Sequence, residues 1–93
     1  MKVVFLDSAV EELEWFKTYY DEVFTAGAGR GYERLKAAIE LLEQNPKAGR
    51  HNEALKGCRD LVMTSTPFVL VYRITETQVE ILHVKDARSN RPF

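Results

Sequence analysis

Hydrophobic residues recur along this chain with two different periods, and these periods predict its elements. Residues 2–6, KVVFL, are short, β-branched and apolar, which is typical of a strand. Three apolar runs near the end of the chain also predict strands, and the middle run is apolar on both faces, as in a covered central strand. These three runs are residues 59–64, 67–74 and 79–85.

A helical period occupies the first half of the chain. Ser8 and Glu11 have the spacing of a capping box, so they predict the start of a first helix. Aromatic residues dominate the hydrophobic stripe that follows, and a stripe of this kind more often forms core than a binding face. The stripe comprises Leu13, Trp15, Phe16, Tyr19, Tyr20, Val23 and Phe24.

The glycine-rich segment 25–31, TAGAGRG, predicts a turn between two helices. It fits neither fingerprint of a phosphate-binding loop, and it does not leave a strand. Residues 31–46 predict a second amphipathic helix that ends at Pro46. The short connection predicts that the two helices form an antiparallel hairpin.

Residues 45–57 have no sustained period and predict a long loop, which in a compact domain is often functional. The element order β-α-α-β-β-β predicts an α+β fold in a single domain, residues 1–93. In it the N-terminal strand joins a small, mostly antiparallel sheet, and the helical hairpin packs on one face of that sheet. The other face is expected to be open, bordered by the loop and the chain end. Alternation along the last strand predicts four side chains on one side: Val79, Ile81, His83 and Lys85.

The composition of the chain excludes several classes of function. Thirteen Lys and Arg against fourteen Asp and Glu give a net charge of −1, so the chain lacks the basic excess of a domain that grips nucleic acid unaided. The lone Cys58 excludes an internal disulfide and a cysteine metal cluster. No run is long enough to span a membrane and no signal peptide is evident, so we expect a cytoplasmic protein. Metal-ligand spacing is absent, and we expect neither a metal nor another cofactor.

Metal-free cleavage of RNA is the enzymatic chemistry that the residue types allow. It needs a general base, a general acid and cations that stabilise the charge developing at phosphorus. Side chains of these types are His51, Arg59, His83, Asp86 and Arg88. Taken alone, His83 fits a strand-end histidine with structural hydrogen bonds better than a catalytic one.

The run NPKAGRHNEALKGCRDLVMTSTPFVLVYRITETQVEILHVKDAR resembles the RelE/ParE superfamily of bacterial type II toxins. The shared pattern is a helix ending near Asn-Pro, a Gly-Arg loop, Gly-x-Arg entering a strand, two apolar strands and a terminal Ala-Arg. The opening FLDSAVEELEW matches as well, so the resemblance covers essentially the whole chain. It implies one of two activities, cleavage of mRNA on the ribosome or inhibition of DNA gyrase by binding.

The residues at the nuclease positions separate these two activities. RelE carries two basic residues on the strand before VLVY and an arginine just before its LVY, and the matching positions here are Asp60, Val62 and Val69. An acid and two valines cannot neutralise a phosphorane or protonate a leaving oxygen. The resemblance therefore implies a ParE-like toxin that binds gyrase and is not an enzyme. The alternative is a RelE-like mRNA endonuclease that would use His51, His83 and Arg88.

The resemblance also implies two protein partners. A cognate antitoxin, ParD-like or related, would fold a flexible segment onto the toxin. The aromatic residues expected to receive it are Trp15, Phe16, Tyr19, Tyr20 and Phe24. Gyrase is expected to meet the chain end at Lys85, Arg88 and Arg91, with the turn around Arg30 as an alternative. We expect no membrane contact, no direct sequence-specific nucleic acid binding by the toxin alone, and poor solubility without the antitoxin.

Overall fold

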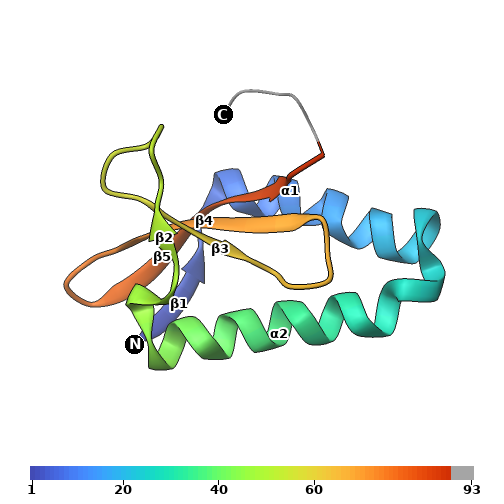
Figure 1. Ribbon diagram of the computed structural model, residues 1–93, viewed down its shortest axis with the longest axis horizontal. Helices are drawn as coiled ribbons and strands as arrows, with labels where there is room; N and C mark the ends of the chain where they lie inside the picture. The colour runs from blue at the N-terminus through green and yellow to red at the C-terminus, as the bar shows by residue number, and fades with distance from the viewer. Residues whose placement is uncertain (89–93) are drawn as a thin grey trace.

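A five-stranded sheet forms the centre of the molecule, in the order β1-β5-β4-β3-β2 (Figure 1). The computed structural model describes residues 1–88. Strand β1 pairs parallel to β5, and every other neighbouring pair is antiparallel. The strands are β1 (Lys2–Phe5), β2 (Arg50–His51), β3 (Arg59–Val62), β4 (Phe68–Ile74) and β5 (Gln78–Asp86). The predicted α+β class and the four predicted strands are confirmed, and β2 is an addition.

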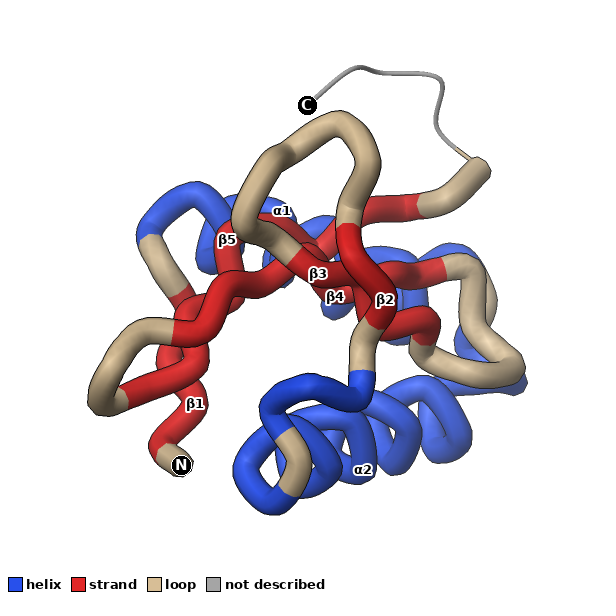
Figure 2. The backbone as a smooth tube through the Cα atoms, turned by 60° about the vertical axis from the view of Figure 1, so that its left-hand side comes forward, coloured by secondary structure: helices blue, strands red, loops and turns tan. Residues whose placement is uncertain are grey.

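Helices α1 (Asp7–Thr18) and α2 (Ala28–Gln44) form the predicted antiparallel pair, joined at one end and diverging toward the other (Figure 1). Helix α1 packs against β5, whereas α2 runs beside β1 (Figure 2). The N-terminal amine, just before β1, donates a 2.6 Å hydrogen bond to the carbonyl of Glu43 near the end of α2. Within residues 1–88, no helix is long and apolar enough to cross a membrane.

The core lies between the helices and one face of the sheet. Phe16 of α1 and Phe68 of β4 meet edge to face, with ring centroids 4.9 Å apart. Both rings are fully buried, and such pairs contribute more than their buried area alone. The other buried hydrophobic residues of this cluster are Ala9, Tyr20, Ala38, Leu42, Met63, Leu70, Tyr72, Val79, Ile81 and Val84.

The predicted capping box is wrong. Helix α1 begins at Asp7, with Leu6 in extended conformation before it, and no side chain caps the helix. The Ser8 hydroxyl instead donates a 2.7 Å hydrogen bond to the carbonyl of Leu82. A contact with β5 thus replaces the local bond that the spacing favoured, because Ser8 lies where α1 crosses that strand.

The connection between the helices begins and ends earlier than predicted. A single π-helical segment, η1 (Tyr19–Val23), and a 3₁₀ turn, η2 (Thr25–Gly27), fill it, so α2 already begins at Ala28. Gly31 therefore lies inside the helix. A β-carbon there would come within 2.6 Å of the Tyr20 ring, so this glycine permits close packing of α2 on that ring and makes no turn.

Part of the predicted loop 45–57 forms regular secondary structure. A 3₁₀ turn, η3 (Pro46–Ala48), is followed by β2, whose residues pair with Asp60 and Arg59 of β3. The Gly49 amide donates a 2.9 Å hydrogen bond to the Tyr72 hydroxyl, and a β-carbon at Gly49 would lie 2.7 Å from that oxygen. Tyr72 thereby fixes the segment that leads into β2.

A bulge changes the side-chain alternation of β5. Val71 of β4 pairs with His83, but the next residue, Tyr72, pairs with Ile81, which leaves Leu82 as the extra residue. Beyond the bulge Val84 is buried and His83 is only half-buried. The predicted one-sided set is therefore wrong beyond Ile81, because period-2 alternation assumes an unbroken ladder.

Candidate functional site

The aromatic stripe of the first helix divides between core and surface. Phe16 and Tyr20 are buried, with 0% and 2% exposure, so they offer no area to a partner. Trp15 and Phe24 remain 43% and 49% exposed, and Tyr19 is half-buried between them. Three of the five residues expected to receive an antitoxin thus lie at the surface, while the other two stabilise the fold.

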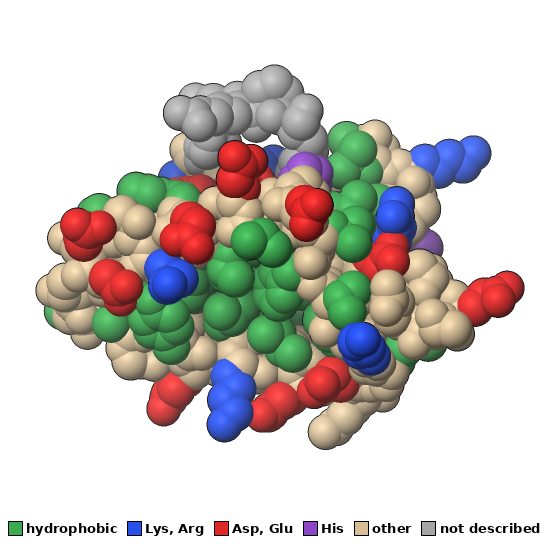
Figure 3. Space-filling view, turned by 180° about the vertical axis from the view of Figure 1, so that it is seen from behind, with side chains coloured by type: hydrophobic (Ala, Val, Ile, Leu, Met, Phe, Trp, Pro, Cys, Tyr) green, Lys and Arg blue, Asp and Glu red, His purple; other side chains and the backbone are tan. Residues whose placement is uncertain are grey.

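Hydrophobic side chains also gather on the face of the molecule seen from behind, in the strip between the two diverging helices (Figure 3). Acidic and basic side chains border this strip. In the helical segment 7–44, the large hydrophobic residues that are at least a third exposed are Val10, Trp15, Val23, Phe24, Tyr32 and Leu41. Exposed apolar area of this kind is a common mark of a protein-binding surface.

The end of β5 is tied to α1 through a cluster that we call the clasp: Trp15, Tyr19, Asp86 and Arg88. The Arg88 guanidinium donates two hydrogen bonds to the Asp86 carboxylate, from Nε to Oδ1 at 3.0 Å and from Nη2 to Oδ2 at 2.9 Å. Its third nitrogen, Nη1, donates to the Tyr19 hydroxyl at 3.2 Å, and Cζ lies 4.6 Å from the Tyr19 ring centroid. The Trp15 indole donates to Asp86 Oδ2 at 3.2 Å.

The electrostatics of the clasp keep both of its charged groups ionised. The hydrogen bonds from the Arg88 side chain are the main reason that the pKa of Asp86 falls to about 2. Burial of the carboxylate opposes this change, while the Arg88 amide and the Trp15 indole add to it. The same hydrogen bonds raise the pKa of Arg88 further above its ordinary range. Asp86 and Arg88 therefore form a bidentate ion pair at the end of β5 at neutral pH.

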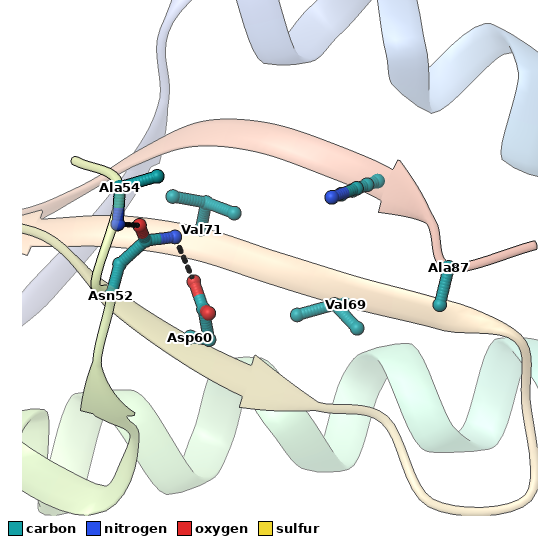
Figure 4. A pocket seen from close by; sticks show the side chains of 7 residues that line it. Asn52, Ala54, Asp60, Val69, Val71 and Ala87 are labelled. Atoms are coloured by element: carbon teal, nitrogen blue, oxygen red, sulfur yellow. Dashed lines mark hydrogen bonds between the residues drawn. The ribbon is translucent and has the colours of Figure 1, made fainter. Parts of the chain in front are cut away.

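The sheet face opposite the core carries an open pocket of about 290 Å³ (Figure 4). Val69 and Val71 of β4 line it, with Asp60 from β3 on one side and the loop residue Asn52 reaching over it. Asn52 donates to the Asp60 carboxylate at 2.7 Å, and its own side-chain oxygen accepts from the amides of two following residues. The remaining lining residues are Ala54, Lys85 and Ala87.

The positions of the nuclease residues coincide with this pocket. Asp60 and Val69, which stand where RelE has basic side chains, both line it, and Val62 is exposed at the end of β3. Asp60 is engaged by Asn52, so it is an acceptor within the fold. A phosphodiester bound at this place would meet the Asp60 carboxylate and Val69 where RelE carries basic side chains. These two positions supply neither an acid nor a charge that stabilises the transition state, and Lys85 is the one cation among the described lining residues.

The alternative catalytic residues do not come together. His83 Nδ1 lies 2.9 Å from Glu12 Oε1 of α1, whereas His51 lies on the edge strand β2, where its Nε2 is 3.4 Å from Arg59. Arg88 is held in the clasp. Arg59 donates to the carbonyl of Gly49 at 2.8 Å and so closes the loop into β2.

The remaining sequence-based expectations concern Arg91, metal binding and Asp86. Arg91 lies outside the described residues. Within residues 1–88, no three His, Cys, Asp or Glu side chains are grouped so that they could hold a metal ion. Asp86 entered the sequence analysis only as an acid or base, and its role in binding Arg88 and Trp15 was missed. The signal in the sequence was the opposite charge of Asp86 and Arg88 only two positions apart, although Arg88 lies in the turn after β5.

Known proteins share both the sequence pattern and the fold. A family model described as "ParE toxin of type II toxin-antitoxin system, parDE" matches residues 3–91. Over 84 residues the chain is 31% identical to "Putative toxin Y4kP" of Sinorhizobium fredii (strain NBRC 101917 / NGR234), covering 90% of this chain and 85% of that protein. The solved structure "Chromosomal ParDE TA system from P. aeruginosa" has the same fold, with a TM-score of 0.73 and 22% identity over 92% of this chain and 95% of that one. The chain therefore belongs to the ParE toxin family of type II toxin-antitoxin systems, a family that acts by binding rather than by catalysis.

Proposed function

We propose that this toxin inhibits DNA gyrase by binding to it, and that a cognate ParD-like antitoxin silences the toxin by folding onto its aromatic surface. The observation that carries the proposal is the lining of the pocket on the open sheet face. Asp60 and Val69 occupy it where a nuclease of the superfamily would carry cations. We therefore assign the toxicity to a protein contact at the chain end.

We assign the target contact to the basic residues near the chain end. Arg88 is half exposed and held in a fixed direction by the clasp, which suits it to a defined protein contact. Lys85 lies close by and lines the pocket, so the pocket and the clasp border the same end of β5. Arg91 belongs to the proposed contact on its sequence position alone.

The antitoxin contact is placed at Trp15, Tyr19 and Phe24. Adjacent rings on this surface lie 6.0 and 6.1 Å apart, so they form a continuous aromatic area on one side of α1 and η1. A segment that folds on binding needs such apolar area, because burying it offsets the entropy lost on ordering. A toxin-antitoxin partnership is also what the solved structural neighbour's title describes for that protein.

Two assays run side by side test the proposed target. One follows the supercoiling of relaxed plasmid by gyrase and ATP in the presence of the purified toxin, and the other follows mRNA cleavage on programmed ribosomes. We expect supercoiling to be lost, or linear DNA to be trapped, while the mRNA stays intact. Cut mRNA with unaffected gyrase would instead establish the endonuclease and refute the proposal.

A charge reversal at the chain end sharpens the assay. The substitution Arg88→Glu should abolish gyrase inhibition, because it turns a cation on the contact surface into an anion beside Asp86. Arg73→Glu is the matched control, since Arg73 also pairs with a carboxylate, Glu80, at 2.7 Å and is about as exposed as Arg88. Equal loss of inhibition in both variants, or full inhibition by Arg88→Glu, would place the gyrase contact elsewhere.

A further inference from the structure

The surfaces assigned to the two partners share the carboxylate of Asp86. Asp86 accepts hydrogen bonds from Trp15, which belongs to the antitoxin surface, and from Arg88, which belongs to the target surface. Tyr19 touches both, because its ring lies 6.0 Å from that of Trp15 and beneath the Arg88 guanidinium. The aromatic area and the arginine are therefore parts of one continuous surface.

The clasp leaves Arg88 able to bind one further acceptor. Three of the five guanidinium N–H groups are used by the bonds to Asp86 and Tyr19. The side chain is 53% exposed and the Trp15 side chain beside it is also partly exposed. A ligand that fits this arrangement has an apolar side chain for the rings and, next to it, a carboxylate for the guanidinium.

The formal charges favour a peptide over a polyanion. Asp86 and Arg88 cancel, so the clasp presents a local hydrogen-bonding cation without the positive field that attracts a nucleic acid backbone. The net charge of −1 acts in the same direction. The ligand that complements the clasp is therefore a mainly apolar peptide segment with one carboxylate.

We propose that the clasp is part of the antitoxin site: an apolar and acidic antitoxin segment covers Trp15 and Tyr19 and places a carboxylate on Arg88. This inference rests on the function proposed above. It states how neutralisation works, because the segment covers the arginine that the toxin uses on its target. Antitoxin and target then exclude each other by direct competition, and Asp86 is the positioning residue that makes the shared surface possible.

Calorimetric titration of the purified toxin with its full-length cognate antitoxin tests this inference. We expect Arg88→Gln and Asp86→Asn each to raise the Kd at least tenfold. Arg88→Lys, which keeps the charge but loses the two-pronged grip, should fall between Arg88→Gln and the unchanged chain. The controls Arg73→Gln and Glu80→Gln remove the same kind of ion pair at the other end of β5, and should change the Kd less than twofold.

Thermal unfolding of every variant accompanies the titration, so that a loss of binding is read only from folded protein. Unchanged antitoxin affinity in Arg88→Gln and Asp86→Asn would overturn the inference, as would equal weakening in the two controls. Gyrase that the unchanged toxin fails to inhibit would refute the proposed target instead. The titration would still decide whether the antitoxin uses the clasp, because it contains no gyrase.

Discussion

Two pairs of aromatic residues on the same helical stretch have different roles, although they are neighbours in the sequence. Phe16 and Tyr20 lie in the core, where their ring centroids are 5.1 Å apart, while Trp15 and Tyr19 lie one position earlier and reach the clasp. One helical residue is a rotation of about 100°. That rotation leaves Trp15 exposed and Tyr19 half-buried, with the Tyr19 ring still 5.6 Å from that of Phe68, while Phe16 and Tyr20 are enclosed in the core.

The largest difference between the two pairs is expected in stability. Phe16→Ala removes a fully buried ring and should lower the free energy of unfolding by about 3–5 kcal/mol. Trp15→Ala removes a side chain that is 43% exposed, and should cost about 1–2 kcal/mol through its bond to Asp86 and the apolar area that it buries. Chemical denaturation monitored by far-UV circular dichroism measures both. Similar losses in the two variants would show that the surface pair is also structural.

A smaller effect is expected from one oxygen in the buried region. The Tyr72 hydroxyl donates to the carbonyl of Pro46 at 2.6 Å and accepts from the Gly49 amide at 2.9 Å. Tyr72→Phe leaves both backbone groups without this partner and should cost about 1–3 kcal/mol. Its control is Tyr32→Phe, because that hydroxyl donates to Asp21 at the exposed surface and its loss should change stability by less than about 0.5 kcal/mol. A Tyr72→Phe variant as stable as the control would show that the loop into β2 is held by other contacts.

The sequence predicted the elements where local patterns decide them. The aromatic period of α1 and the apolar run of β4 needed no knowledge of the partners of either segment. The bulge at Leu82 could not be predicted, because it depends on how β5 pairs with β4. Ser8 was assigned to a local cap for the same reason, since its actual acceptor, Leu82, is 74 residues away.

The candidate site shows the same division. Arg88 and the aromatic residues were recognised by type and by resemblance, and Asp60, Val62 and Val69 argued against the nuclease from the sequence alone, with the nuclease kept as the alternative. The clasp required the fold, because Trp15 and Asp86 are 71 residues apart and Tyr19 and Arg88 are 69 apart. Which aromatic residues face outward also needed the fold, since a stripe this wide has no unique buried side.

The last and smallest effect distinguishes the clasp from the Arg73–Glu80 ion pair through its pH dependence. The pKa of Asp86 is about 2, below its ordinary value of 3.8, so the folded state favours the charged carboxylate. This contribution to stability is complete above about pH 4 and is lost as the pH falls toward 2. The pKa difference corresponds to about 2 kcal/mol at most, and the exposure of Arg88 reduces this to about 1 kcal/mol. Asp86→Asn should therefore be less stable by that amount at pH 7 and equal to the unchanged chain near pH 2.

Denaturant titrations at pH 7, 4 and 2.5 measure the difference, with Glu80→Gln as the control. The pKa of Glu80 is also lowered, chiefly by the hydrogen bond from Arg73, so its contribution begins to be lost below its ordinary value of 4.5. Asp86 accepts four hydrogen bonds and Glu80 two, from Arg73 and Gln78, so Asp86→Asn should show the larger difference. A difference that stays the same across this pH range would mean that the negative charge of Asp86 does not stabilise the fold. The clasp would then hold Arg88 through neutral hydrogen bonds and packing alone.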